Sequence, residues 1–216
     1  MARARLKNMH TVCMKIERRT QAARTTATRG ALIAAGRALF TERSYAEVSA
    51  EEIVAAAGVT RGALYHHFED KKGLFAAVFE AIEEETIARL AAAGGEGGAL
   101  DRIRAGTRAW LDLCREPEVH RIALIEAPAV LGWERWRAIG DRYSLALVEH
   151  LLSSAIAAGE IPPQPVPPLA HVLLGMVREG ALFLATAADP AQAQDDVGRV
   201  VDRLLLGLGQ PGRTVV

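Results

Sequence analysis

The pattern of hydrophobic and polar residues predicts helices throughout the chain. Between about residues 26 and 42, apolar side chains recur at three- and four-residue spacing, including Leu32, Leu39 and Phe40. This spacing places them on one face of a helix. No segment shows the period-two alternation of a strand, and we find no internal repeat. The sequence therefore predicts an all-α protein with about nine helices.

Two breaks divide the helical pattern. The first is the flexible stretch GGEGG at 94–98, and the second is the rigid stretch GEIPPQPVPP at 159–168. We expect one long helix before the first break, at about 71–93. The pattern predicts further helices at about 100–115, 119–126, 133–158, 169–187 and 193–208.

Two short helices are predicted on either side of a glycine turn. Ser49 is a good N-cap residue, and Glu52 three positions later completes a capping box. Gly58 can take the left-handed conformation that ends a helix. Thr60 is then the N-cap of a second short helix at about 61–67. This order of elements is typical of a helix-turn-helix.

The second short helix has an apolar side and a polar side. Leu64 and Phe68 are four residues apart and are expected to hold the helix to a core. The residues expected on the outward, polar face of the helix are Arg61, Gly62, Tyr65 and His66. The free N–H groups and the dipole at the start of a helix favour anions, and a helix of this kind can enter a DNA major groove.

The sequence gives little support for metal binding or catalysis. His66 and His67 are adjacent, so on a helix their side chains diverge by about 100° and rarely bind one ion together. No nucleophile–base motif surrounds Ser49 or Cys114. We therefore expect no catalytic residue, no metal and no cofactor.

Charge is distributed unevenly along a chain whose net charge is zero. Residues 1–75 contain 13 lysines and arginines against 7 acids, and residues 76–216 contain 13 against 19. A basic first third indicates a polyanionic partner at that end, although a solvated basic tail would give the same count.

The stretch AEVSAEEIVAAAGVTRGALYHHFEDKKGLFAAVFE resembles the DNA-binding domain of the TetR family of bacterial transcriptional regulators. The resemblance covers about residues 26–85. It implies a three-helix DNA-binding head, a long connector helix, and a larger helical domain for effector binding and dimerisation. The implied boundaries are a disordered basic extension at 1–24, a head at 25–70 with its motif at about 49–68, a connector at 71–93, and a C-terminal domain at 98–210.

The resemblance also implies which residues contact DNA. Arg61 is expected to read a base, Tyr65 to donate its hydroxyl to a phosphate, and Lys71 to bind another phosphate. Gly62 would let the backbone approach the DNA. The full set of expected contacts is Arg24, Thr25, Ser49, Thr60, Arg61, Gly62, Tyr65, His66 and Lys71.

The C-terminal half carries aromatic, histidine and methionine side chains that suit either a ligand pocket or an ordinary core. The candidates for a pocket are Trp110, His120, Trp133, Trp136, Tyr143, His171, Met176 and Phe183. The last two helices are more apolar than one buried face requires, which predicts a homodimer formed through them. A monomer that buries both helices internally is the alternative.

We therefore expect a DNA-binding regulator, a repressor released from a palindromic double-stranded operator by a small apolar or aromatic effector. The alternatives are an effector-independent or architectural DNA-binding protein, or an enzyme that acts on its bound small molecule. No apolar run approaches the length that spans a bilayer, no secretory signal is evident, and two distant cysteines suggest no disulfide, so we expect a cytoplasmic protein.

Overall fold

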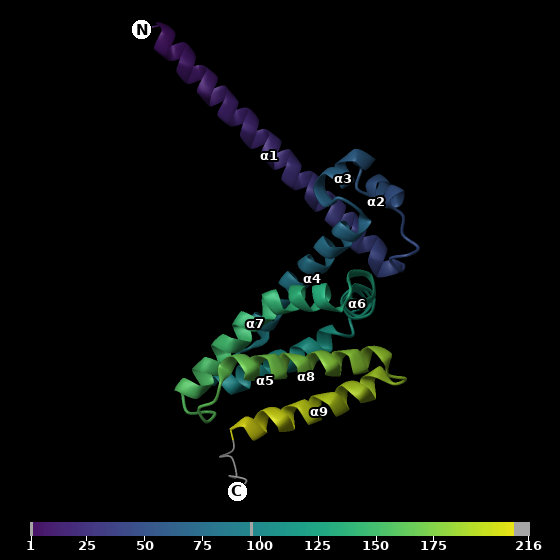
Figure 1. The fold of residues 1–216 in the computed structure, drawn as a ribbon, viewed down its shortest axis with the longest axis vertical. Coiled ribbons are helices and arrows are strands. Elements are labelled where there is room, and N and C mark those ends of the chain that lie inside the picture. The colour runs from purple at the N-terminus through teal and green to yellow at the C-terminus, as the bar shows by residue number, and fades with distance from the viewer. Residues whose placement is uncertain (1, 96, 210–216) are drawn as a thin grey trace. The chain divides into compact units, whose positions relative to one another are not determined.

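A computed structural model of the chain describes residues 2–95 and 97–209, with side chains from residue 21 onward. Within these residues the only regular elements are helices: nine α-helices and one π-helix (Figure 1). The all-α prediction is confirmed. The chain divides into two compact units, Met1–Val78 and Phe79–Val216.

The first unit contains α1 (Ala2–Glu42), α2 (Ala50–Ala56), α3 (Arg61–Phe68) and the beginning of α4 (Lys71–Ala93). The sequence predicted a first helix from about residue 26, after a disordered extension, but α1 is helical from Ala2. Neither proline nor glycine occurs before Gly30, and alanine, arginine and lysine are abundant, so no residue there interrupts the helix.

Side chains from all four helices form the core of the first unit. The aromatic rings of Phe40 on α1 and Phe75 on α4 meet edge to face, with 5.1 Å between their centres. Tyr45, in the loop after α1, packs against both rings. The fully buried residues of this core include Leu32, Phe40, Val48, Ile53, Leu64, Leu74, Phe75 and Val78.

The caps of the two short helices largely match the prediction. The Ser49 hydroxyl accepts a hydrogen bond from the Glu52 N–H at 3.2 Å, and the Ser49 N–H donates to the Glu52 carboxylate at 2.8 Å, so the capping box is confirmed. Gly58 has a φ of 65° and makes the turn. Thr60 occupies the N-cap position of α3, but its hydroxyl makes no capping hydrogen bond.

The junction between α3 and α4 allows no side chain at Gly73. A Cβ atom there would lie 2.0 Å from the carbonyl oxygen of Phe68, which is the last residue of α3. The Gly73 N–H donates to the Asp70 carboxylate at 2.6 Å, so Asp70 caps α4. This close approach fixes the end of α3 against the start of α4.

Lys71 has a structural role that the sequence did not predict. Its ammonium donates to the carbonyl oxygens of Tyr45 and Val48, each at 2.8 Å, and lies 4.0 Å from the centre of the Tyr45 ring. Lys71 therefore ties the loop between α1 and α2 to α4. Two of its three N–H donors are used in these contacts and one is left, so the expected phosphate contact stays a prediction.

The second unit continues α4 and adds six elements. They are α5 (Ala99–Leu113), η1 (Val119–Glu126), α6 (Ala127–Leu131), α7 (Trp133–Ala157), α8 (Val166–Thr186) and α9 (Pro190–Leu208). The helix predicted at 119–126 is a π-helix. Pro128 lies in the first turn of the following helix α6, where the N–H group that proline lacks has no partner within the helix.

Helices α5, α7, α8 and α9 enclose the main core of the second unit, and α8 and α9 lie side by side (Figure 1). Its most buried members include Leu152 and Ala155 on α7, Ala170 on α8 and Leu205 on α9. By length and composition, α8 could cross a bilayer, whereas the sequence analysis expected no apolar run of that length. One face of α8 nevertheless packs in this core. The helix also contains two charged residues, Arg178 and Glu179.

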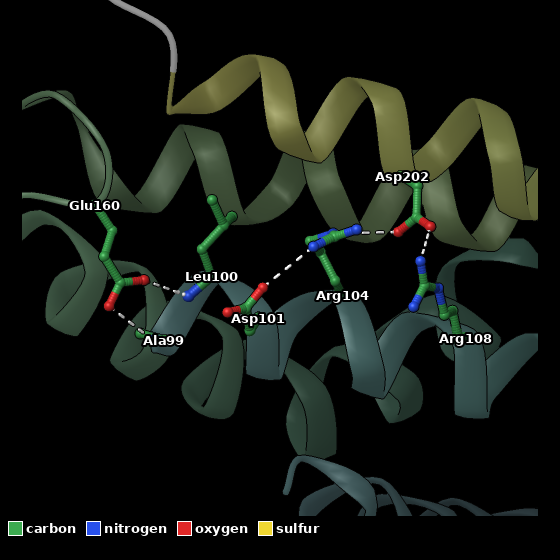
Figure 2. A network of polar contacts seen from close by, with 7 residues as sticks. All are labelled: Ala99, Leu100, Asp101, Arg104, Arg108, Glu160 and Asp202. Carbon is green, nitrogen blue, oxygen red and sulfur yellow. Dashed lines mark hydrogen bonds and ion pairs between the residues drawn. The ribbon is translucent and has the colours of Figure 1, made fainter. Parts of the chain in front are cut away.

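Polar contacts join α5 to distant parts of the second unit (Figure 2). The Glu160 carboxylate, after α7, accepts hydrogen bonds from the N–H groups of Ala99 and Leu100 at 3.0 and 2.7 Å and so caps α5. Asp202 on α9 pairs with two arginines of α5, Arg104 and Arg108.

We predict that Lys71→Met lowers the stability of the first unit by about 1–3 kcal/mol, because two partly buried carbonyls lose a charged donor. Urea unfolding of the variant checks this. Lys72→Met is the matched control, since Lys72 is the next residue of the same helix and is exposed. Unchanged stability of Lys71→Met would contradict this structural role, and a weaker salt dependence of DNA binding would support the phosphate contact.

We predict that Glu160→Ala destabilises the second unit by about 1–2 kcal/mol, because two N–H groups at the start of α5 lose their acceptor. Thermal unfolding measures the loss. Glu84→Ala, at an exposed position of α4, should change stability by less than about 0.5 kcal/mol. Equal effects of the two substitutions would show that the cap contributes nothing.

Candidate functional site

The helix α3 presents a polar face to solvent. Leu64 and Phe68 are buried, whereas Thr60, Arg61, Gly62, Tyr65 and His66 are exposed. The predicted division of this helix into an inner and an outer side is confirmed. The outer side carries donors and acceptors at consecutive turns, as a surface that reads a groove requires.

Arg61 is the most prominent charge on that face. Its guanidinium forms an ion pair with Glu51 at 2.8 Å and donates to the Tyr65 hydroxyl oxygen at 3.3 Å. The hydrogen bond to Tyr65, and then the charge of Glu51, raise the pKa of Arg61 above its ordinary value, so it stays charged. Because 62% of the Arg61 side chain and 60% of the Glu51 side chain are exposed, the ion pair is weak and easily exchanged.

The remaining expected DNA contacts differ in their availability. Arg24 and Thr25 are exposed on α1, although the Thr25 hydroxyl donates to the Gln21 carbonyl at 2.9 Å. Both the hydroxyl and the N–H of Ser49 are engaged with Glu52. The structure therefore leaves the outer face of α3 and the two residues of α1 accessible, and it commits Ser49, like Lys71, to contacts within the head.

Arg29 is a candidate that the sequence did not suggest. Its guanidinium lies 5.2 Å from the centre of the Phe68 ring, which places an exposed basic residue of α1 beside the end of α3. The two residues are far apart in the sequence, and no motif links them.

The second unit contains a largely apolar cavity of about 160 Å³. Helices α4, α5, α7 and α8 provide most of its wall, and residues of η1 and α9 complete it. Of the eight residues expected to line a pocket, three do so: Trp110, Trp136 and Met176. Their apolar neighbours include Phe79, Ile87 and Leu147.

The other five expected residues lie outside the cavity wall. Trp133 is 52% exposed and packs against Trp136, and Phe183 is 57% exposed on α8. His171 is exposed, and Tyr143 is partly buried away from the cavity. A ring nitrogen of His120 lies 3.1 Å from the Ala185 carbonyl oxygen, so this histidine joins η1 to α8.

The cavity wall contains charged side chains that the sequence did not predict there. Glu83 on α4, Arg178 on α8 and Arg102 on α5 all line the cavity. Burial raises the pKa of Glu83 to about 7, and the charge of Arg178 opposes this shift. The signal for Glu83 was present, because it lies four residues from both Phe79 and Ile87 on the buried stripe of α4.

The environment of Cys114 at the end of α5 makes it unreactive. The residue is buried, and burial, followed by the charge of Glu83, raises the pKa of its thiol well above the ordinary value. A neutral thiol is a poor nucleophile and a poor metal ligand.

Comparison with known proteins places both units. Residues 32–78 match the model of the bacterial regulatory proteins of the tetR family, and residues 100–208 match a tetracyclin repressor-like C-terminal domain. The crystal structure of a TetR-family transcriptional regulator from Pectobacterium atrosepticum is 35% identical. That match covers 88% of this chain and 98% of the other, with a TM-score of 0.78.

Two curated relatives match over shorter stretches. The HTH-type transcriptional regulator CymR of Pseudomonas putida is 40% identical over 94 residues, which cover 42% of this chain and 46% of CymR. The TetC protein of transposon Tn10 from Escherichia coli is 27% identical over 130 residues, which cover 60% of this chain and 66% of TetC. The matches thus span less than two thirds of either relative.

The C-terminal model alone matches half of the chain, the N-terminal model covers the core of the helix-turn-helix unit, and a solved member matches over nearly its whole length. The chain therefore belongs to the TetR family of bacterial transcriptional regulators.

Proposed function

We propose that this regulator is a homodimeric repressor that binds a palindromic operator and leaves it when a small apolar or aromatic molecule fills the cavity. The observation that carries the proposal is the combination, in one chain, of an exposed polar recognition face on α3 and an apolar cavity in the second unit. The regulator would act in the cytoplasm, where its DNA lies.

Base readout is assigned to Arg61. A guanidinium can bridge the O6 and N7 atoms of guanine, and Arg61 reaches outward from the first residue of α3. Binding a base would require it to leave Glu51, which costs little at an exposed position. Tyr65 would donate to a phosphate, because its hydroxyl accepts from Arg61 and keeps its own proton free. The remaining contacts with DNA would come from Thr60, Gly62, His66, Arg24 and Thr25.

Exposed apolar side chains on α8 and α9 support dimerisation. Val172 is 67% exposed, and Phe183, Val200, Leu204 and Leu206 are each about half exposed. Apolar surface of this extent on two neighbouring helices indicates association. A two-fold dimer would place two recognition helices on successive turns of the major groove, about 34–36 Å apart.

Release by an effector follows from linkage. If the effector binds better to the dimer when it is off DNA, it lowers the DNA affinity, and DNA lowers the effector affinity by the same factor. Helix α4 is a natural route for this coupling because Leu74 belongs to the core of the head while Glu83 and Ile87 line the cavity. An effector-independent DNA-binding protein would show no such coupling, and an enzyme would turn its ligand over.

Operator selection tests the proposal. Purified protein should enrich a short palindrome from random oligonucleotides, bind it at two protomers per site, and resist competition by random DNA. Deleting the gene should raise transcription from promoters that carry the palindrome. Weak and steeply salt-dependent binding with no enriched sequence would contradict the proposal, because it would show only a basic surface.

We predict that Arg61→Ala weakens operator binding by about 1–3 kcal/mol and relaxes the preference at one base position. Binding to a set of operators with single-base changes measures both effects. Glu51→Ala is the matched control, since it removes the same ion pair and leaves the guanidinium, and it should not weaken binding. Uniform weakening of all sequences by Arg61→Ala would contradict its role in base readout.

We predict that Leu204→Arg converts the dimer to a monomer and weakens operator binding, because it places a charge in the apolar face of α9. Sedimentation velocity measures the mass. Ile125→Arg is the control, since Ile125 is an exposed apolar residue of η1 outside that face. A Leu204→Arg protein that keeps the mass of the dimer would rule out this interface.

A further inference from the structure

The acid in the cavity wall has an unusual environment. Glu83 lies between Phe79 and Ile87 on successive turns of α4, and all three side chains line the cavity. Among the described residues, Glu83 makes no hydrogen bond and no ion pair within 4 Å. A carboxylate in apolar surroundings without a partner is costly, so this position needs an explanation.

The basic residue nearest to Glu83 is already paired with another acid. Arg178 on α8 donates to the Asp141 carboxylate of α7 at 2.6 Å, and Asp141 also accepts from Arg137 at 3.3 Å. Glu83 and Arg178 both approach Gly140, where a Cβ atom would lie 3.7 Å from the Glu83 carboxylate and 4.0 Å from the Arg178 guanidinium. Arg178 therefore lessens the cost of an ionised Glu83 but bonds to Asp141.

The other groups that face the cavity leave Glu83 without a counter-ion. Arg102 of α5 lies beside Gly94, just beyond the end of α4, which is roughly 16 Å along the helix from Glu83. Cys114, directly after α5, does not line the cavity, and burial raises the pKa of its thiol so that it stays neutral. The polar side chains Thr107 and Ser144 donate their hydroxyls to carbonyls of their own helices.

Aromatic rings surround the same space. Phe79, Trp110 and Trp136 line the cavity with Glu83. The faces of aromatic rings attract cations, and rings combined with an acid are the chemistry that recognises a quaternary ammonium group. Arg178 already lies 5.4 Å from the centre of the Trp136 ring, so one cation–π contact exists in this wall.

We propose that the cavity binds a small aromatic or apolar molecule that carries a positively charged nitrogen, with Glu83 as its counter-ion. The inference rests on the proposed function, in which this cavity is the effector site. The ligand cation would replace the solvent that the ionised carboxylate has lost, and the aromatic rings would pack around the apolar part. A cavity of about 160 Å³ suits a molecule with one aromatic ring.

Direct binding to purified protein tests the inference with two probes of the same shape. Benzyltrimethylammonium carries the charge, and neopentylbenzene is its neutral isostere. We expect the wild-type protein to bind the cation more tightly than the isostere. Glu83→Gln should weaken cation binding by about tenfold to a hundredfold and leave the binding of the isostere unchanged.

Glu80→Gln is the matched control. Glu80 lies three residues before Glu83 on the same helix, approaches Arg142 at 3.4 Å, and does not line the cavity. The same change from acid to amide at this position should leave binding of both probes unchanged.

The pH dependence supplies an independent readout. Burial raises the pKa of Glu83 to about 7, and the ionised form is the one that binds a cation. Affinity for benzyltrimethylammonium should therefore rise as the pH increases through about 7 and level off above it, because the probe itself does not titrate. The Glu83→Gln protein should show no such rise. If that variant does not fold, the two probes and the pH dependence of the wild-type protein still decide the question.

Three results would overturn the inference: equal affinity for the two probes, unchanged cation affinity in folded Glu83→Gln, or tighter binding of the anion phenylacetate than of the cation. Operator binding without any probe is measured on the same protein. If the operator binds and the cation does not, only the present inference fails. If no operator is bound, the proposed function fails.

Discussion

The packing of α4 is the constraint on which the rest of the structure depends. This one helix supplies Leu74, Phe75 and Val78 to the core of the DNA-binding unit and Phe79, Ile82 and Glu83 to the second unit. Its start is fixed by the Asp70 cap, by the close approach of Gly73 to Phe68, and by the Lys71 hydrogen bonds. The same helix thus contributes residues to the core beneath α3 and to the wall of the cavity.

The two candidate sites differ in the surroundings of their charged residues. On α3, Arg61 is exposed and pairs with the exposed Glu51. Breaking this ion pair to bind a nucleic acid therefore costs little free energy. In the largely apolar cavity, Glu83 makes no ion pair within the described part of the chain, so its ionised form is unfavourable until a cation arrives. The first arrangement suits a surface that meets highly charged DNA in water. The second suits selection of one kind of small molecule, because an uncharged ligand would leave the carboxylate unsatisfied.

Local signals made much of the fold predictable, and tertiary contacts explain most of what was missed. The bounds of α4 follow from Asp70 before it and the glycine-rich break after it, and the capping box of α2 and the two sides of α3 follow from spacing. The start of α1 had no such marker, because no residue before Gly30 breaks a helix. The resemblance assigned Lys71 to a phosphate, and its hydrogen bonds to the carbonyls of Tyr45 and Val48 were not foreseen because these residues lie more than twenty positions away. Of the residues expected in the pocket, three of eight line it, since composition cannot tell which side of a helix faces a cavity and which faces solvent.

In the proposed mechanism, the operator and the cavity ligand each weaken the binding of the other. The most direct test measures the affinity of a cavity ligand for the free protein and for the protein saturated with operator. We expect weaker ligand binding to the operator complex, and we expect saturating ligand to weaken operator binding by the same factor. Equal ligand affinity for the free and the operator-bound protein would contradict it, because a ligand without differential affinity cannot shift the equilibrium.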